Sequence, residues 1–115
     1  MKPVRIALSR RAGFDLQALS KSLNGLPAHS VARPGPWGNP FTIAAVMDDT
    51  GLGKEAAQAE AVARYGRWIS GALEGPKAPP EIKAIRAELG GRNLACWCRA
   101  GTPCHVDALL ELANE

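Results

Sequence analysis

Three cysteines and one histidine near the C-terminus are the residues of this sequence best suited to chemistry. Cys96, Cys98, Cys104 and His105 follow the spacing C-x-C-x5-C-H, and they include every cysteine of the chain. Zinc prefers thiolate and imidazole ligands, and a thiol beside an imidazole is also an arrangement used in thiol-based catalysis. The segment from residue 96 to residue 105 is therefore the strongest candidate site.

The elements expected around this motif bring the four side chains together. Residues 93–98 (NLACWC) predict a buried strand, in which alternate side chains share a face, so the first two cysteines point the same way. The pair Thr102-Pro103 is typical of a helix start, with the threonine as N-cap and the proline as the first helical residue. This start places Cys104 and His105 in the first turn of the last helix.

The first interpretation is a structural zinc site with Cys96, Cys98, Cys104 and His105 as its ligands. Closed sites of this type hold small domains together, so the protein would be a zinc-binding module that mediates binding rather than catalysis. The spacing is not a common zinc pattern. Neighbouring residues point about 100° apart on a helix, so Cys104 and His105 can share one ion only at a helix end.

The second interpretation makes Cys104 a reactive thiol. A cysteine in the first turn of a helix has its thiolate favoured by unpaired backbone N–H groups and by the helix dipole. His105 or Asp107 would accept or orient the proton, and another cysteine nearby could resolve an oxidised form. Cys104, His105 and Asp107 are therefore the candidate catalytic residues if the protein is an enzyme, a point that the sequence leaves open.

The third interpretation is a ligand pocket in which the first turn of the last helix binds an anion, most simply a phosphate. Arg33, Arg99 or Arg11 would supply positive charge, and Asn39 and Asp107 would contact polar groups of the ligand. Trp37 would stack on a base or a sugar, because aromatic side chains are effective stacking platforms.

A fourth interpretation requires no site at all. Free cysteine is among the most buried residue types and packs like a small hydrophobe. The loop from Arg33 to Phe41 (RPGPWGNPF) has three prolines and two glycines, which prevent regular structure. Its aromatic side chains, Trp37 and Phe41, need a hydrophobic environment, so we expect the loop to be clamped against the rest of the protein. Both rings could then simply fill the hydrophobic core.

Strands and helices are expected to alternate along the chain. Short strands are predicted at residues 4–8 and 29–32, and a further strand is considered near 41–46. Amphipathic spacing predicts helices at 16–24 (after Asp15), 54–73, 81–89 and from about Pro103 onward. This alternation predicts a small two-layer or three-layer α/β domain, with a short parallel or mixed sheet of three or four strands and flanking helices. In such sheets ligands bind beyond the carboxyl ends of the strands.

Length and composition limit the function classes. The chain has 115 residues, which fit a single domain over residues 1–115, and an apolar content of 46%, enough for a core without disulfides. The net charge of +3 is mild and does not indicate a dedicated nucleic-acid surface. No apolar stretch is long enough to span a membrane, and the N-terminus is unlike a signal peptide. We therefore expect a cytoplasmic protein with reduced cysteines and no membrane partner.

Five segments together resemble a known family. They are IALSRRAGF at 6–14, VARP at 31–34, WGNPF at 37–41, LACWC at 94–98 and CHVD at 104–107. This combination is similar to domain-of-unknown-function family 4326, which is found in bacteria and their phages. The family brings no established activity with it, but the link to phages favours a nucleotide or nucleic-acid context. The resemblance implies a signature made of Arg33, Trp37, Asn39, Cys96, Cys98, Cys104, His105 and Asp107.

The leading hypothesis is a pocket for a nucleotide-like or phosphorylated small molecule. It would be walled by the Arg33–Phe41 loop and by the turn from Cys98 to Asp107. The alternative is the structural zinc module described above. The sequence does not define a reaction, a nucleic-acid partner or an oligomeric state.

Overall fold

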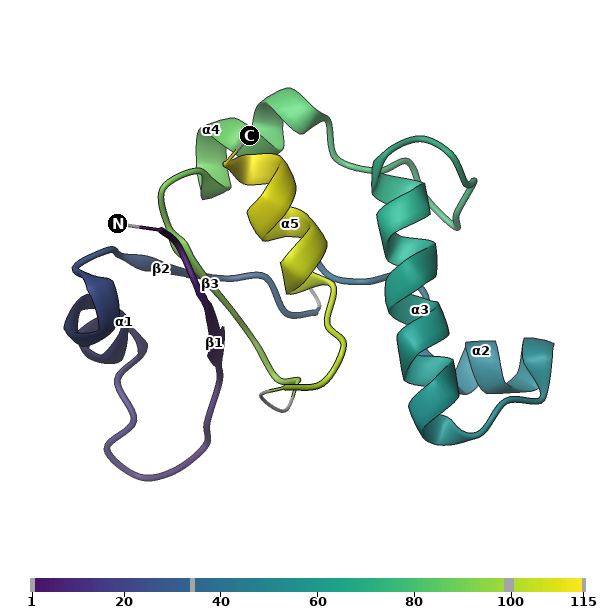
Figure 1. Ribbon diagram of the computed structural model, residues 1–115, viewed down its shortest axis with the longest axis horizontal. Helices are drawn as coiled ribbons and strands as arrows, with labels where there is room; N and C mark the ends of the chain where they lie inside the picture. The colour runs from purple at the N-terminus through teal and green to yellow at the C-terminus, as the bar shows by residue number, and fades with distance from the viewer. Residues whose placement is uncertain (1, 34, 99–100, 115) are drawn as a thin grey trace.

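A parallel three-stranded sheet forms the centre of the protein, as seen in a computed structural model that describes residues 2–33, 35–98 and 101–114 (Figure 1). The strands are β1 (Arg5–Ala7), β2 (Ala28–Ser30) and β3 (Asn93–Cys96), in the order β1-β3-β2. Both neighbours run parallel to β3. The carboxyl ends of all three strands therefore lie at one edge of the sheet.

The described residues form five helices around this sheet. Figure 1 shows α1 on one side of the strands and α4 and α5 on the other, which confirms the predicted small α/β architecture. The helices are α1 (Leu16–Asn24), α2 (Ile43–Thr50), α3 (Lys54–Ile69), α4 (Ile82–Leu89) and α5 (Val106–Ala113).

All four residues of strand β3 are buried, and their side chains pack on both faces of the sheet. Leu94 and Cys96 belong to the main hydrophobic core, while Ala95 packs with Ile6 and Ala28 in a smaller cluster on the α1 side. The amide of Asn93 also faces α1, where its Nδ2 donates to the hydroxyl of Ser20 at 2.7 Å. This alternation follows from the two-residue period of a strand.

Helix α1 has the boundaries that the sequence predicts. The carboxylate of Asp15 accepts a hydrogen bond from the N–H of Ala18, and Gly25 ends the helix in the left-handed conformation at φ 78°. Glycine adopts this conformation without steric cost. Local residue chemistry alone is sufficient to define this element.

The segment after the Arg33–Phe41 loop, which we call the Pro-Gly loop, is a helix, so the strand considered near residues 41–46 is wrong. The Thr42 hydroxyl accepts a hydrogen bond from Ala45 N–H and caps α2. Val46 of α2 then packs against Ala57 and Ala61 of α3. A short apolar run fits either element, and here the cap together with the neighbouring helix selects the helix.

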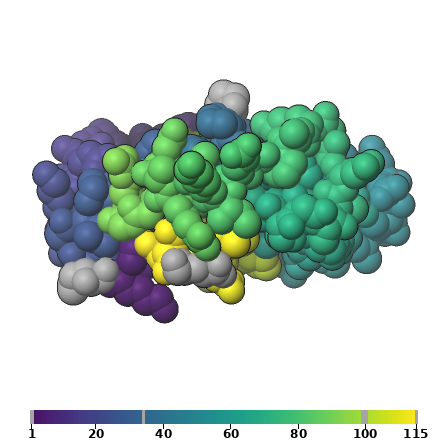
Figure 2. Space-filling view, turned by 90° about the horizontal axis from the view of Figure 1, so that it is seen from above, coloured from purple at the N-terminus to yellow at the C-terminus, as the bar shows by residue number. Residues whose placement is uncertain are grey.

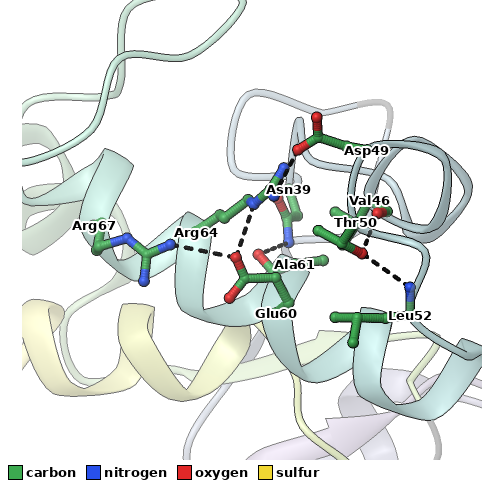
Figure 3. A network of polar contacts seen from close by, with 9 residues as sticks. All are labelled: Asn39, Val46, Asp49, Thr50, Leu52, Glu60, Ala61, Arg64 and Arg67. Carbon is green, nitrogen blue, oxygen red and sulfur yellow. Dashed lines mark hydrogen bonds and ion pairs between the residues drawn. The ribbon is translucent and has the colours of Figure 1, made fainter.

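An ion pair joins α2 and α3 at the outer end of the molecule. Arg64 of α3 contacts Asp49 of α2 at 2.8 Å, and within α3 it contacts Glu60 at 3.0 Å (Figure 3). The space-filling view shows this helix pair at one end and the N-terminal third at the other, over an extent of 41 Å (Figure 2). Helices α2 and α3 therefore lie beside the sheet and do not cover one of its faces.

Three predicted boundaries differ near the site. Helix α3 ends at Ile69 rather than at residue 73, and β3 ends at Cys96 rather than at Cys98. Helix α5 begins at Val106, not near Pro103. The connection from β3 to α5 is therefore longer than expected, and most of the cysteine motif lies on it.

The main core joins α3, α4, α5 and the sheet. Tyr65 and Trp68 of α3 are completely buried and pack with Leu94 of β3 and Leu109 of α5. None of the helices in the described part of the chain combines the length and the apolar character needed to cross a lipid bilayer.

Candidate functional site

The sulfur atoms of Cys96, Cys98 and Cys104 lie within 4.8 Å of one another and form a compact cluster. Cys96 is the last residue of β3, and Cys98 follows after the strand has bent. Cys104 returns from the connection just before α5 and lies 2.9 Å from Cys96, sulfur to sulfur. Cys96 and Cys104 are buried and Cys98 is half-buried, and all three are free thiols. This cluster could hold a metal ion.

His105 lies beside the cluster in one defined orientation. Its Nε2 is 2.9 Å from the carbonyl oxygen of Val31, and its Nδ1 is 3.7 Å from the sulfur of Cys104. The ring of Tyr65 packs edge-on against it with centroids 5.1 Å apart. The pKa of His105 is lowered, mainly because burial disfavours the charged form of the ring. Because a carbonyl only accepts, the proton of the neutral ring is on Nε2, and Nδ1 keeps a lone pair.

The three sulfur atoms form the cluster, and the ring nitrogens of His105 lie outside it. The group of candidate ligand atoms that lie within 4.8 Å of one another consists of the three sulfurs, without His105. The ring approaches Cys104 but is held by Val31. Three of the four predicted metal ligands are therefore clustered, and the fourth is adjacent to them.

The thiolate is favoured at Cys98 rather than at Cys104. Hydrogen bonds with the Cys104 and Cys96 thiols lower the pKa of Cys98. Hydrogen bonds with Cys96 and Cys98, together with burial, raise the pKa of Cys104. The helix-dipole argument predicted the opposite for Cys104, and it fails because α5 begins two residues after this cysteine. For Cys96 the hydrogen bond with Cys104 lowers the pKa, but Cys98 and burial outweigh it.

A cleft of about 640 Å³ opens above the cluster. Cys96, Cys98 and His105 contribute to its lining. The remaining lining residues come from the Pro-Gly loop and the residue before it, the start of α2, the N-terminal part of α3 and the connection to α5. They are Ala32, Arg33, Asn39, Phe41, Ile43, Lys54, Glu55, Gln58, Ala61, Val62, Trp97, Thr102 and Pro103. The volume is typical of sites for small molecules.

The connection between β3 and α5 is held in place by neighbouring elements. Arg5 of β1 donates from Nη1 to the carbonyl of Thr102 at 2.7 Å. Gln58 of α3 donates from Nε2 to the carbonyl of Pro103 at 2.9 Å. These two bonds, with the His105–Val31 contact, fix the segment that carries Cys104.

Asn39, predicted to contact a ligand, has a structural role. Its Nδ2 donates to the carbonyl of Ala61 in α3 at 3.1 Å, and its Oδ1 accepts from the N–H of Phe41 at 2.8 Å (Figure 3 shows the first bond). The side chain is buried, although it borders the cleft. Asn39 thus anchors the Pro-Gly loop to α3, and this confirms the expectation that the loop is clamped.

Trp37 lies in the core and does not line the cleft. Its side chain is 5% exposed and belongs to the main hydrophobic cluster, and its carbonyl accepts a hydrogen bond from the hydroxyl of Tyr65 at 2.8 Å. The buried surroundings raise the pKa of this tyrosine. Trp37, predicted to stack on a ligand, therefore packs in the hydrophobic core, as the alternative interpretation of the loop describes.

Arg33 reaches the cleft from the other predicted wall. Its Nη1 lies 3.4 Å from the carbonyl oxygen of Asn39, and the residue is exposed. Arg99, the other predicted cation, lies outside the described residues. Arg33 is therefore the predicted ligand-binding cation that borders the cleft.

Asp107 does not join Cys104 and His105. Its side chain is 61% exposed and pairs with Arg5 at 3.5 Å. It lines a different hollow, together with Lys2, Pro3 and residues of α5. The predicted catalytic set is therefore divided, because the first turn of α5 turns Asp107 away from the cleft.

The sequence analysis missed Trp97 as a cleft residue. This side chain is 49% exposed, and the guanidinium of Arg10 lies 4.6 Å from the centre of its ring. Alternation along β3 indicated only that it points away from Cys96 and Cys98. Because the strand ends at Cys96, Trp97 borders the same cleft as both cysteines. The available signal was a tryptophan between two cysteines, close to the end of the strand predicted for residues 93–98.

Comparison with known proteins shows the kinship of the chain. A family model described as "Domain of unknown function (DUF4326)" matches residues 20–115, which include the Pro-Gly loop and the whole cysteine motif. Searches of curated proteins and of solved structures found no match. Since the family model covers more than half of the sequence, the chain belongs to the DUF4326 family.

Proposed function

We propose that this protein is a zinc-binding domain whose metal site forms the base of a ligand cleft. The observation that carries the proposal is the approach of three free sulfur atoms to within 4.8 Å of one another. Three thiolates are a common part of structural zinc sites.

The sulfur geometry fits zinc after small movements. With Zn–S bonds of about 2.3 Å, a tetrahedral site separates its sulfur atoms by about 3.8 Å. The limit of 4.8 Å for the whole cluster is compatible with this spacing, while Cys96 and Cys104 must move apart from 2.9 Å. Rotation about the side-chain bonds of a cysteine is sufficient for such a change. The low pKa of Cys98 supports binding because metal ligation requires a thiolate.

In the proposed site His105 supplies the fourth ligand through Nδ1. Its Nε2 is engaged by the Val31 carbonyl, which is the usual outer contact of a metal-bound histidine. The distance of 3.7 Å from Nδ1 to the Cys104 sulfur is close to the value of about 3.5 Å expected between nitrogen and sulfur ligands of one zinc ion. A modest shift of the ring toward Cys96 and Cys98 completes the tetrahedron.

Metal analysis of the purified protein tests this proposal. We expect one zinc per chain that survives dialysis, and loss of that zinc in Cys98→Ser, which alters the most exposed ligand. Replacement of zinc by Co²⁺ should give the intense visible absorption of a tetrahedral thiolate site. His105→Gln should weaken zinc binding and change the Co²⁺ spectrum, because one nitrogen ligand is removed.

The chain provides a matched control, since His29 is its other histidine and lies in β2. His29→Gln should leave the zinc content and the Co²⁺ spectrum unchanged. Protein that contains no zinc, and that takes up neither zinc nor Co²⁺ under reducing conditions, would contradict the proposal. An unchanged spectrum in His105→Gln would assign the fourth position to another group.

A second role is supported by the charges on the cleft. Arg33 and Lys54 line it, and Glu55 is the one acidic residue among its lining residues. We therefore propose that the cleft binds a phosphorylated small molecule, with these two cations as the phosphate contacts. The volume of about 640 Å³ fits this class of ligand. The proposed role is binding, and it assigns no reaction to the cysteines.

A further inference from the structure

We infer that the ligand of the cleft is a nucleoside phosphate, whose base stacks on Trp97 while its phosphate contacts Arg33 and Lys54. The inference rests on the proposed phosphate-binding role of the cleft and adds the base to it. It does not depend on the presence of zinc. Three features of the described residues carry it, namely the exposure of Trp97, its contact with Arg10 and the charges across the cleft.

Trp97 is the exposed tryptophan of the three in the chain. Trp68 is completely buried and Trp37 nearly so, whereas Trp97 leaves 49% of its surface open. Removing apolar surface from water is favourable, so a large ring at the opening of a cleft is more readily explained by a partner than by packing. A planar ligand group is the partner that covers the most of such a ring.

Arg10 fixes the orientation of this ring. Its guanidinium lies 4.6 Å from the centroid, within the range of a cation–π contact. Arg10 follows β1 and Trp97 follows β3, so the contact joins two neighbouring strand ends. The ring is further constrained because its chain neighbours, Cys96 and Cys98, belong to the sulfur cluster. A platform held in this way loses little freedom when a base stacks on it.

Two positively charged side chains of the cleft are suited to contact a phosphate group. Arg33 comes from the loop after β2, and Lys54 is the first residue of α3. Both line the cleft that Trp97 also lines. A ligand that contacts all three side chains must combine a flat aromatic part with an anionic part. A nucleoside phosphate has this combination, whereas a sugar phosphate lacks the flat part and a free base lacks the charge.

Binding titrations with four probes test the inference: adenosine 5′-monophosphate, ribose 5-phosphate, adenosine and inorganic phosphate. Stacking of a base on an aromatic side chain strengthens binding by about 5- to 150-fold. We therefore expect the nucleotide to bind about 5- to 150-fold more tightly than ribose 5-phosphate. Trp97→Ala should remove this advantage and leave the affinity for ribose 5-phosphate unchanged, while Trp97→Phe should restore most of it.

Variants of Arg33 and Lys54 distinguish stacking on Trp97 from the proposed phosphate-binding role on which the inference rests. Arg33→Ala and Lys54→Ala should weaken binding of both phosphorylated probes, and Lys83→Ala on α4, outside the lining of the cleft, should not. Equal affinities for the nucleotide and ribose 5-phosphate, or a nucleotide affinity indifferent to Trp97→Ala, would overturn the stacking inference alone. Failure of both phosphorylated probes to bind at millimolar concentration would overturn the phosphate-binding role and the inference together.

A short single-stranded oligonucleotide distinguishes two sources of the same chemistry. If a tetranucleotide binds more tightly than the mononucleotide and depends equally on Trp97, the base and the phosphate belong to a strand. If it binds no more tightly, the ligand is a free nucleotide. Both results support stacking on Trp97. Zinc content is measured in parallel for each variant, so that an effect on the metal site is recognised.

Discussion

At the residue scale, the conformation of the Pro-Gly loop depends on Gly38, which packs closely against Arg33 at the start of the loop. A Cβ atom at Gly38 would lie 2.6 Å from Cγ, 3.1 Å from Cα and 3.2 Å from the nitrogen of Arg33. Part of this contact is with backbone, which cannot rotate away. Gly38 therefore allows the loop to close beside Arg33, the cation that borders the cleft.

We predict that Gly38→Ala destabilises the protein by about 1–3 kcal/mol, the usual cost of inserting an atom into a packed place. The matched control is Gly66→Ala in α3, where an added Cβ meets no atom within 4 Å. Alanine is the better helix former, so this control should stabilise the protein by about 0.5–1 kcal/mol. Urea unfolding of both variants provides the measurement. Equal effects at the two positions would show that the contact with Arg33 is unimportant.

At the same scale, the assignment of roles within the cysteine motif changes. Cys98, not Cys104, is the thiol whose pKa is lowered, and it is also the most exposed of the three. A reactive-thiol interpretation would therefore centre on Cys98. His105, held between Val31 and Cys104, is the one member of the predicted catalytic set that keeps a lone pair toward the sulfur atoms.

At the element scale, α1 is stabilised by its own capping residue. The Asp15 carboxylate accepts the N–H of Ala18 at 3.1 Å at an exposed helix end. The helix covers the sheet on the face opposite α5 and supplies Ser20, whose hydroxyl accepts from Asn93 of β3. Fraying of α1 would thus loosen the strand that ends at Cys96.

We predict that Asp15→Ala lowers the free energy of unfolding by about 0.5–2 kcal/mol, the usual value of an N-cap. Asp15→Asn is the control, because asparagine caps a helix about as well as aspartate does. Both variants are measured by thermal unfolding followed by circular dichroism. If Asp15→Asn were as unstable as Asp15→Ala, the effect would come from charge rather than from the cap.

At the scale of the whole molecule, the proposed zinc joins parts of the chain that meet across the core. Cys96 ends the central strand, and Cys104 and His105 precede α5, which packs on that strand and on α4. His105 also contacts Val31, which follows β2. A metal at this point would link the sheet, the segment that follows β2 and the last helix.

We predict that chelation of the metal lowers the stability of the whole protein. A ligand present at 1,000 times its dissociation constant stabilises the native state by about 4 kcal/mol. For a protein of this size that corresponds to a fall in Tm of about 10 °C or more. The comparison is a thermal scan with and without a zinc chelator in reducing buffer.

Cys98→Ser serves as the control for this scan, because it should already lack tightly bound zinc and should not respond to the chelator. A melting temperature of the unaltered protein that is independent of the chelator would contradict a structural role for the metal.

Some features of this protein follow from the sequence alone. Asp15 and Gly25 delimit α1 by local hydrogen bonding and by backbone conformation, so no distant contact is needed to predict it. The convergence of Cys96, Cys98 and Cys104 was also predictable, because the chain returns within a few residues and this restricts where the sulfur atoms can lie. The strand period does not account for Cys98, since β3 ends at Cys96. The WGNPF and CWC segments further indicated the family, which the family model confirms.

Other features were decided only by tertiary structure. The apolar run after Phe41 fits a short strand as well as a helix, and residues 43–50 form a helix because α3 offers an apolar face to Val46, in addition to the cap at Thr42. Trp37 is buried and Trp97 is exposed, although both are tryptophans beside glycine or cysteine in irregular segments. Burial depends on which distant side chains arrive at a position, here Tyr65 for Trp37 and Arg10 for Trp97. Sequence spacing determines local conformation, whereas the assembly of distant elements determines which side chains face the cleft.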